Sequence, residues 1–190
     1  MTDLLKKEQL KDLFEIQEQF DNRIPTRNLE DTVASLIIEF VEWINTLEFN
    51  KNWKKHPGKP LEVQLDELAD FLAFNLQLGL LCKDQWEWDA DEFDESLDVM
   101  VEMVNEQKLV PKLQSVSFVY ALNRITQMFT KQIDDSIFQI VLLPFLYANQ
   151  YYSIEQLIDA YKKKMQHNHR RQDGTVDQDK GCLLYTSDAA

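Results

Sequence analysis

The sequence predicts an all-α fold, a single-domain helical bundle. Of its 190 residues, 44% are hydrophobic, which can form one sizeable core but leaves little material for a second domain. The chain contains only four glycines and five prolines, and long stretches contain neither. A fold of short strands would need a turn about every ten residues, so helices account for the composition better than a β-sandwich does.

Hydrophobic residues recur at helical spacing through most of the chain. A polar loop with Pro57, Gly58 and Pro60 separates the second predicted helix from the third. Asp135 and Ser153 are candidate N-caps, because their side-chain oxygens can accept hydrogen bonds from free backbone N–H groups. The predicted helices span about 4–20, 29–48, 61–81, an acidic segment that ends before Pro111, 111–129, 135–149 with a kink favoured at Pro144, and 153–168.

The last ten residues, 181–190, neither continue a helical pattern nor have the composition of a linker. They resemble translated sequencing-adapter sequence and are left out of the fold prediction. We therefore expect a helical domain over 1–175 and a disordered or non-native tail over 176–190.

Several classes of protein are disfavoured by the sequence. No stretch of 18 apolar residues occurs, and the mixed charges of residues 1–11 are unlike a signal peptide. Cys82 and Cys182 lie far apart, without the spacing of zinc ligands, and are expected to be free thiols. These observations predict a cytoplasmic protein without a membrane partner.

The net charge of −13 is unevenly distributed. Ten acidic residues and no Lys or Arg lie between Asp84 and Glu106, and the remainder of the chain is nearly neutral. A binder of nucleic-acid polymers is not expected from this balance. Two purely basic stretches could still bind an anionic substrate. They contain Lys51, Lys54, Lys55 and Lys59 in the first, and Lys162, Lys163, Lys164, Arg170 and Arg171 in the second.

Two pairs of acidic residues lie on neighbouring predicted helices. Glu39 and Glu42 are three residues apart, and so are Glu67 and Asp70. Residues with this spacing share one helix face, with Cβ atoms roughly 5–6 Å apart. Each pair lies nearly opposite the apolar stripe of its helix, and a carboxylate in that position is ordinarily a solvated surface residue.

The neighbours of these carboxylates favour a second interpretation. On the third helix, Phe71, Phe74 and Leu78 flank or continue the line of the acids, and Trp43 follows Glu39 by one turn. Buried charges need a partner, and a divalent cation is the usual one for clustered carboxylates. Mg²⁺ takes oxygen ligands, and phosphate chemistry commonly uses two such ions. If the helices fold back on each other, the four carboxylates could hold two or more Mg²⁺ ions.

Around these acids, the sequence resembles the dimeric all-α dUTP diphosphatases found in some phages, bacteria and trypanosomatids, a family related to the MazG-type nucleotide pyrophosphohydrolases. The family signature is Glu-x-x-Glu on one helix and Glu-x-x-Asp on the next, here Glu39 to Glu42 and Glu67 to Asp70. The resemblance covers about residues 13–174. It implies the all-α NTP pyrophosphohydrolase fold, a nucleoside triphosphate substrate and a homodimer.

Three further segments resemble the family in the same order along the chain. The first helix is similar to a family segment whose glutamine contacts the uracil, and the stretch after the second helix is similar to one whose Trp lies near the base. The last helix follows the spacing of an element that reads the base and binds the phosphates. The substrate-binding residues expected from these matches and their surroundings are Gln17, Lys51, Trp53, Phe74, Lys164, Asn168 and Arg171.

The departures from the family pattern concern the base more than the metal. Asn50 replaces a Phe, Ala73 stands where many members have a His, Met165 interrupts a Lys-Asn pair, and Thr175 replaces a Tyr. Trp53 also has a structural alternative, because it could cover the loop against the core. The sequence therefore supports nucleotide hydrolysis more strongly than it supports uracil as the base.

The resemblance implies hydrolysis of dUTP to dUMP and pyrophosphate by a Mg²⁺-activated water, with Glu39 orienting or deprotonating that water. One alternative is a related pyrophosphohydrolase acting on another nucleoside triphosphate, such as dCTP. A second is an inactive helical protein-interaction module that uses the acidic segment as a docking surface.

Overall fold

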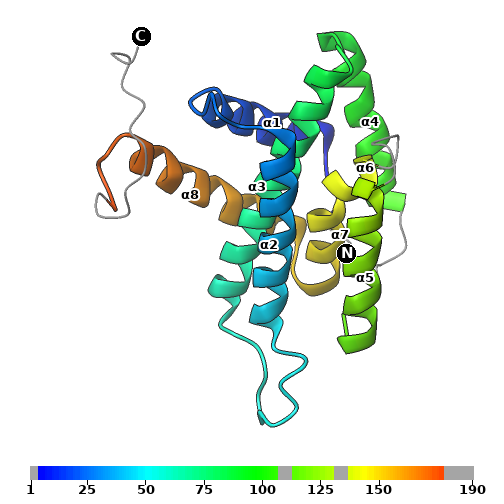
Figure 1. The fold of residues 1–190 in the computed structure, drawn as a ribbon, viewed down its shortest axis with the longest axis vertical. Coiled ribbons are helices and arrows are strands. Elements are labelled where there is room, and N and C mark those ends of the chain that lie inside the picture. The colour runs from blue at the N-terminus through cyan, green and yellow to red at the C-terminus, as the bar shows by residue number, and fades with distance from the viewer. Residues whose placement is uncertain (1–3, 107–112, 131–136, 178–190) are drawn as a thin grey trace.

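The computed structural model describes residues 4–106, 113–130 and 137–177, and every regular element in these ranges is a helix (Figure 1). The all-α prediction is confirmed. The helices are α1 (Lys7–Asp21), α2 (Leu29–Leu47), α3 (Leu61–Gln85), α4 (Ala90–Glu106), α5 (Ser115–Thr130), α6 (Ile137–Val141), α7 (Leu143–Tyr151) and α8 (Ile154–Gln172).

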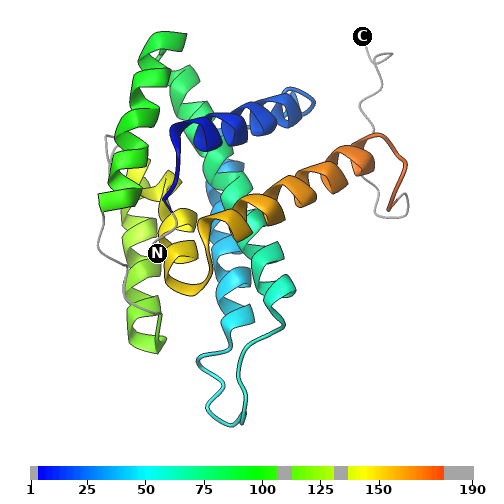
Figure 2. The same cartoon turned by 180° about the vertical axis from the view of Figure 1, so that it is seen from behind.

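Helices α2 and α3 form an antiparallel pair joined by the long loop at one end of the molecule (Figure 2). The Asn28 side chain caps α2 by accepting a hydrogen bond from the Asp31 N–H at 2.9 Å. Glu48 ends α2 in the left-handed region, with φ 52°. Its buried carboxylate then accepts hydrogen bonds from the Lys51 and Lys54 ammonium groups and the Gly58 N–H, so one side chain organises the loop.

Helix α3 lies at the centre of the fold and contacts α1, α2, α6, α7 and α8. Large aromatic side chains fill the space between them: Phe40, Trp43, Phe71 and Phe145 are fully buried. The Trp43 and Tyr147 ring centroids are 4.9 Å apart. Burying each such side chain contributes roughly 1.5–3 kcal/mol, so this interface fixes how α2 and α3 are oriented to each other.

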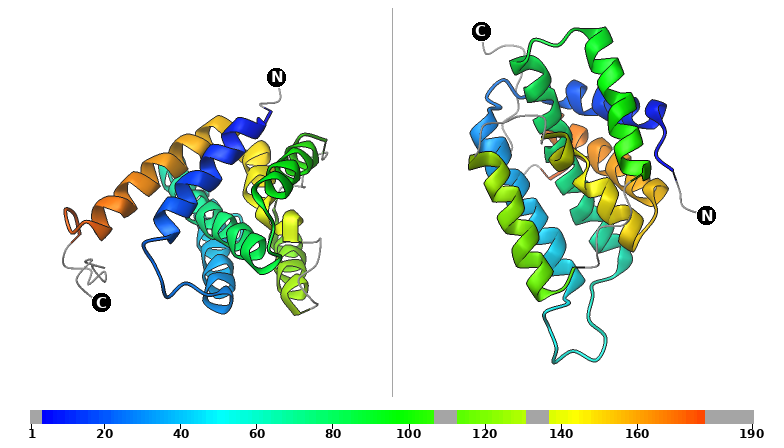
Figure 3. Two further views of the ribbon diagram at one scale, coloured as in Figure 1. Left: turned by 90° about the horizontal axis from the view of Figure 1, so that it is seen from above. Right: turned by 90° about the vertical axis from the view of Figure 1, so that its right-hand side faces the viewer.

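Helices α1 and α8 run side by side and in the same direction across the α2–α3 pair (Figure 3). Tyr161 of α8 is buried against α1, and its hydroxyl donates a hydrogen bond to the Gln17 side chain. Near the ends of both helices, Arg23 pairs with Asp173 at 2.6 Å. These contacts fix the position of α8 relative to α1, and so its position over α3.

The acidic segment forms α4, and part of its charge is compensated by α1. The Lys7 ammonium group lies 2.7 Å from carboxylate oxygens of Asp94 and Asp98, and Lys11 pairs with Asp94 at 2.8 Å. The lysines hold the pKa of Asp94 down, at about 2. This face of the acidic helix is therefore a contact within the chain.

Helix bounds differ modestly from those predicted. Helix α1 begins at Lys7, α3 continues to Gln85 and α8 to Gln172. Between α6 and α7 the chain breaks at Leu142, and Pro144 lies in the first turn of α7, where a missing N–H costs nothing. The kink favoured near this proline is thus a break between two helices.

The run 137–147 is mostly buried in the chain's own core. Ser153 caps α8 by accepting a hydrogen bond from the Gln156 N–H at 3.1 Å, whereas the proposed cap Asp135 lies outside the described residues. Cys82 is a buried free thiol. Cys182 and the predicted tail from 178 onward also lie outside the described residues. No helix in the described ranges is long and apolar enough to cross a membrane.

Gly79 permits the close approach of α1 to α3. A Cβ at this position would lie 2.9 Å from Cε1 of the Phe14 ring and 3.6 Å from Cγ2 of Val141. Phe14 is itself buried, so its ring has little room to move.

We expect Gly79→Val to lower the free energy of unfolding by about 2 kcal/mol or more, because the added methyl groups overpack the contact with Phe14. Urea denaturation followed by circular dichroism measures this. Gln85→Val, exposed in the last turn of the same helix, is the control and should change stability by less than about 0.5 kcal/mol. Equal stability of the two variants would contradict the packing described.

Candidate metal and nucleotide site

The four predicted acids are presented by the packed pair α2 and α3. Phe40 on α2 and Leu68 on α3 are fully buried and anchor the opposite faces of these helices in the core. Of the acids, Glu39, Glu67 and Asp70 are half-buried and Glu42 is exposed. The core contacts of each helix therefore determine where its carboxylates point.

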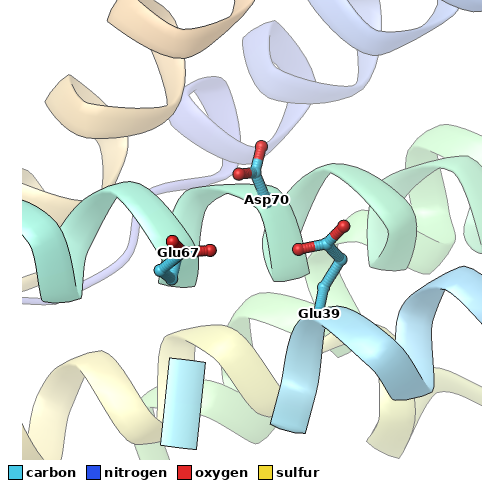
Figure 4. A group of neighbouring side chains, drawn as sticks. All are labelled: Glu39, Glu67 and Asp70. Atoms are coloured by element: carbon cyan, nitrogen blue, oxygen red, sulfur yellow. The ribbon is translucent and has the colours of Figure 1, made fainter. Parts of the chain in front are cut away.

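Three of the acids converge. Glu39, Glu67 and Asp70 each offer one carboxylate oxygen, and these atoms lie within 4.8 Å of one another. Figure 4 shows Glu39 reaching from α2 toward α3, where it lies beside Asp70, with Glu67 one turn away. We call these three residues the carboxylate trio. Their spacing is one that a single ion, or a pair of ions, could bridge.

Glu42 lies outside the carboxylate trio but close to it. Burial is the largest cause of the raised pKa of Glu39, Glu67 and Asp70, and repulsion from the Glu42 carboxylate adds to it. The place of Glu42 among the metal ligands stays a prediction.

The electrostatics of the trio are dominated by burial and by repulsion between neighbouring carboxylates. Burial, followed by repulsion from Asp70, Glu42 and Glu67, raises the pKa of Glu39 to about 7. Burial also raises the pKa of Glu67 and of Asp70, and for Asp70 a nearby lysine partly offsets the effect. Carboxylates so placed bind a cation favourably, because it relieves their repulsion and replaces lost hydration.

Lys164 of α8 reaches this site. Its ammonium group lies 2.6 Å from an Asp70 carboxylate oxygen and 2.8 Å from one of Asp66. Asp66 was not among the residues predicted from the sequence. Asp66 lies four residues before Asp70 and therefore on the same side of α3, and this spacing could have indicated it from the sequence.

The donor set of the trio suits a hard divalent cation. All three groups are carboxylates, whose oxygens are the ligands that Mg²⁺ prefers, and they come from two rigid helices. No described His or Cys joins the cluster, so the ligands are not those of a typical structural zinc site. The residues therefore fit the predicted ion.

Gln17, expected to contact the base, lies in a buried polar network. Its Nε2 donates to Asp21 Oδ1 at 2.7 Å, and its Oε1 accepts from the Tyr161 hydroxyl at 2.9 Å. Gln77 also donates to Asp21, at 3.1 Å, and in turn accepts from Thr32. Both ends of the Gln17 amide are thus engaged within the protein, and its contact with a base stays a prediction.

Two other expected substrate residues lie on the loop after α2. Lys51 pairs with Glu48 at 2.9 Å, and Trp53 is 75% exposed. The alternative that Trp53 covers the loop against the core is therefore wrong. Phe74 is half-buried on α3, one turn beyond Asp70, and packs against the core.

The remaining expected residues lie further along α8. Asn168 and Arg171 are half-buried, and the Arg171 Nε is 3.5 Å from a carboxylate oxygen of Asp177. Among the expected phosphate and base contacts, Lys164 is the one that the structure places directly against the acids. The other contacts are not tested by this geometry.

Comparison with known proteins shows the family. Residues 9–175 match the profile of the family described as dUTPase. The matched range spans the positions of the four predicted acids. No curated protein matches the chain.

The buried Asp21 predicts a pH-dependent stability. Burial raises its pKa from 3.8 to about 6, so the folded protein holds this proton more tightly than the unfolded chain does. Stability from this group is therefore fully present below pH 4 and is lost as pH rises through 6. Between pH 4.5 and 7, we expect the wild type to lose roughly 2 kcal/mol relative to Asp21→Asn. Urea titrations of both proteins at several pH values measure this difference, and parallel pH profiles would contradict it.

Crowding in the trio predicts that neutralising one member stabilises the metal-free protein. With EDTA present, we expect Glu39→Gln to raise the unfolding free energy by about 1 kcal/mol, or roughly 2–4 °C in melting temperature. Differential scanning calorimetry at pH 8 measures the shift. Glu102→Gln, which removes an exposed carboxylate from α4, is the matched control and should leave the melting temperature nearly unchanged. A lower melting temperature for Glu39→Gln would contradict the crowding.

Proposed function

The chain belongs to the dUTPase family, and from that premise we propose that it hydrolyses dUTP to dUMP and pyrophosphate with the help of Mg²⁺ held by the carboxylate trio. The observation that carries the proposal is the convergence of Glu39, Glu67 and Asp70 within 4.8 Å. Such a site has the ligands that metal-assisted phosphate hydrolysis uses.

The trio is proposed to hold the metal from two sides, with Glu39 on α2 facing Glu67 and Asp70 on α3. Glu42 is proposed to join them. Bound Mg²⁺ would neutralise phosphate charge and lower the pKa of a coordinated water. Glu39 is the candidate for orienting or deprotonating the attacking water, because it approaches from the helix opposite the other two carboxylates.

Residues around the trio are proposed to bind the phosphates and the base of the substrate. Lys164 and Arg171 on α8 would offset charge on the phosphates. For the base, the candidates are Gln17, Trp53 and Asn168. Lys51, on the loop after α2, and Phe74, on α3 one turn beyond Asp70, complete the proposed binding residues.

A homodimer is part of the proposal, as the family resemblance implies. The run 137–147 is buried within one chain and offers little to a partner. Exposed apolar side chains are present elsewhere, with Ile38 and Val41 on α2 and Val119 and Tyr120 on α5. These residues are the candidates for covering by a second copy. Light scattering after size-exclusion chromatography distinguishes one copy from two.

We expect Glu67→Gln to lower Mg²⁺-dependent release of pyrophosphate from dUTP by at least about 100-fold, because it removes a charged metal ligand. A coupled pyrophosphate assay measures the rate. Glu62→Gln removes an exposed carboxylate from the same helix and serves as the matched control, with activity close to that of the wild type. Circular dichroism verifies that both variants are folded.

The same assay separates the finer assignments. Full turnover by Glu42→Gln would remove Glu42 from the ligand set, whereas full turnover by Glu67→Gln would overturn the metal assignment itself. A panel of dUTP, dCTP, dTTP and dATP tests the base, and uracil is expected to be preferred. Omitting Mg²⁺ and adding EDTA should abolish turnover.

A further inference from the structure

The Lys164 ammonium group pairs with two carboxylates, one inside the carboxylate trio and one outside it. Asp70 belongs to the carboxylate trio, whereas Asp66 does not. We propose that Lys164 is the internal counter-ion of the metal-free site, and that Asp66 retains its ammonium group when a divalent ion takes Asp70. This inference rests on the proposed metal-binding function of the trio.

The position of Lys164 is set by its helix. Its neighbours Tyr161 and Met165 are buried against the rest of the protein, which fixes the rotation of α8. The Lys164 side chain is only 18% exposed, and its ammonium group lies between two aspartates one turn apart on α3. Lys164 therefore joins α8 to α3 through a pair of salt bridges.

Simultaneous binding of the Lys164 ammonium group and a metal ion to the same Asp70 oxygen is unfavourable. The ammonium group is 2.6 Å from the Asp70 carboxylate, and a Mg²⁺ ligand bond is about 2.1 Å long. Both cations would then lie within a few ångströms of each other, at a half-buried site where repulsion is weakly screened. We therefore infer that a metal ion bound at this oxygen displaces the Lys164 ammonium group from it.

Asp66 offers the displaced ammonium group a partner already within reach. Its carboxylate lies 2.8 Å from the Lys164 ammonium group, and its side chain is 57% exposed. Since Asp66 lies outside the trio, keeping the pair Lys164–Asp66 costs the metal no ligand. Asp66 thus acts as a positioning residue for the lysine.

The exchange couples metal binding to nucleotide binding. Without a nucleotide, competition from Lys164 weakens the affinity for the metal. A triphosphate offers the ammonium group an anionic partner away from Asp70, so it lowers the competition. Each ligand should then strengthen binding of the other by the same factor.

The test is Mn²⁺ binding to the full-length protein, measured by electron paramagnetic resonance with and without the non-hydrolysable α,β-imido analogue of dUTP. Without the analogue, we expect Lys164→Met to bind Mn²⁺ at least tenfold more tightly than the wild type. With the analogue, the wild type should gain more affinity than Lys164→Met does. An unchanged or weaker affinity in Lys164→Met would overturn the proposal.

Matched variants separate the exchange from a general effect of charge. Lys163→Met removes an exposed positive charge at the adjacent position and should not tighten Mn²⁺ binding, whereas Lys164→Arg keeps the counter-ion and should bind as the wild type does. Asp66→Asn should weaken binding in the wild type and have a smaller effect in Lys164→Met. Equal effects of Asp66→Asn in both backgrounds would overturn the retaining role of Asp66.

The proposed function has its own control in the same experiment. If the wild type binds Mn²⁺ and Glu67→Gln does not, the metal site stands whatever Lys164→Met does. A wild type that binds no Mn²⁺ in either condition would overturn the metal site and the counter-ion exchange together.

Discussion

Packing of α2 against α3 forces like charges together, and most of the site's chemistry depends on this. The interface is filled by Phe40, Trp43 and Phe71, and its burial stabilises the fold strongly enough to offset the repulsion it creates. Glu39, Glu67 and Asp70 therefore remain within ligand distance although burial and repulsion from neighbouring carboxylates raise the pKa of each. Packing of the core thus keeps the carboxylates close together despite their repulsion.

Positive charge reaches the trio from a third helix. Lys164 is brought to Asp70 because α8 lies parallel to α1 and is fixed there by Tyr161 and by the pair Arg23–Asp173. Those contacts are remote from the chemistry, yet they set how far the ammonium group extends over α3. The same helix carries Asn168 and Arg171, so the placement of α8 governs several proposed substrate contacts together.

Two other buried carboxylates, Asp21 and Glu48, show how partner groups offset the cost of burying a charge. Asp21 is kept inside by hydrogen bonds from Gln17 and Gln77 and by Arg27, and burial still raises its pKa to about 6. Glu48 is the opposite case, since the Lys54 and Lys51 ammonium groups hold its pKa at about 2. Partners decide whether a buried carboxylate stabilises the fold or weakens it as pH rises.

The fold class, the approximate helices and the two acidic pairs can be predicted from the sequence alone, because helical period and i, i+3 spacing are local properties of the chain. Three features became visible in the folded chain alone: Glu42 lies outside the trio, Gln17 belongs to a buried network, and Lys164 bridges Asp66 and Asp70. These facts depend on how each helix is rotated and where it crosses its neighbours. Side-chain packing between distant segments sets that rotation, and no local spacing in the sequence encodes it.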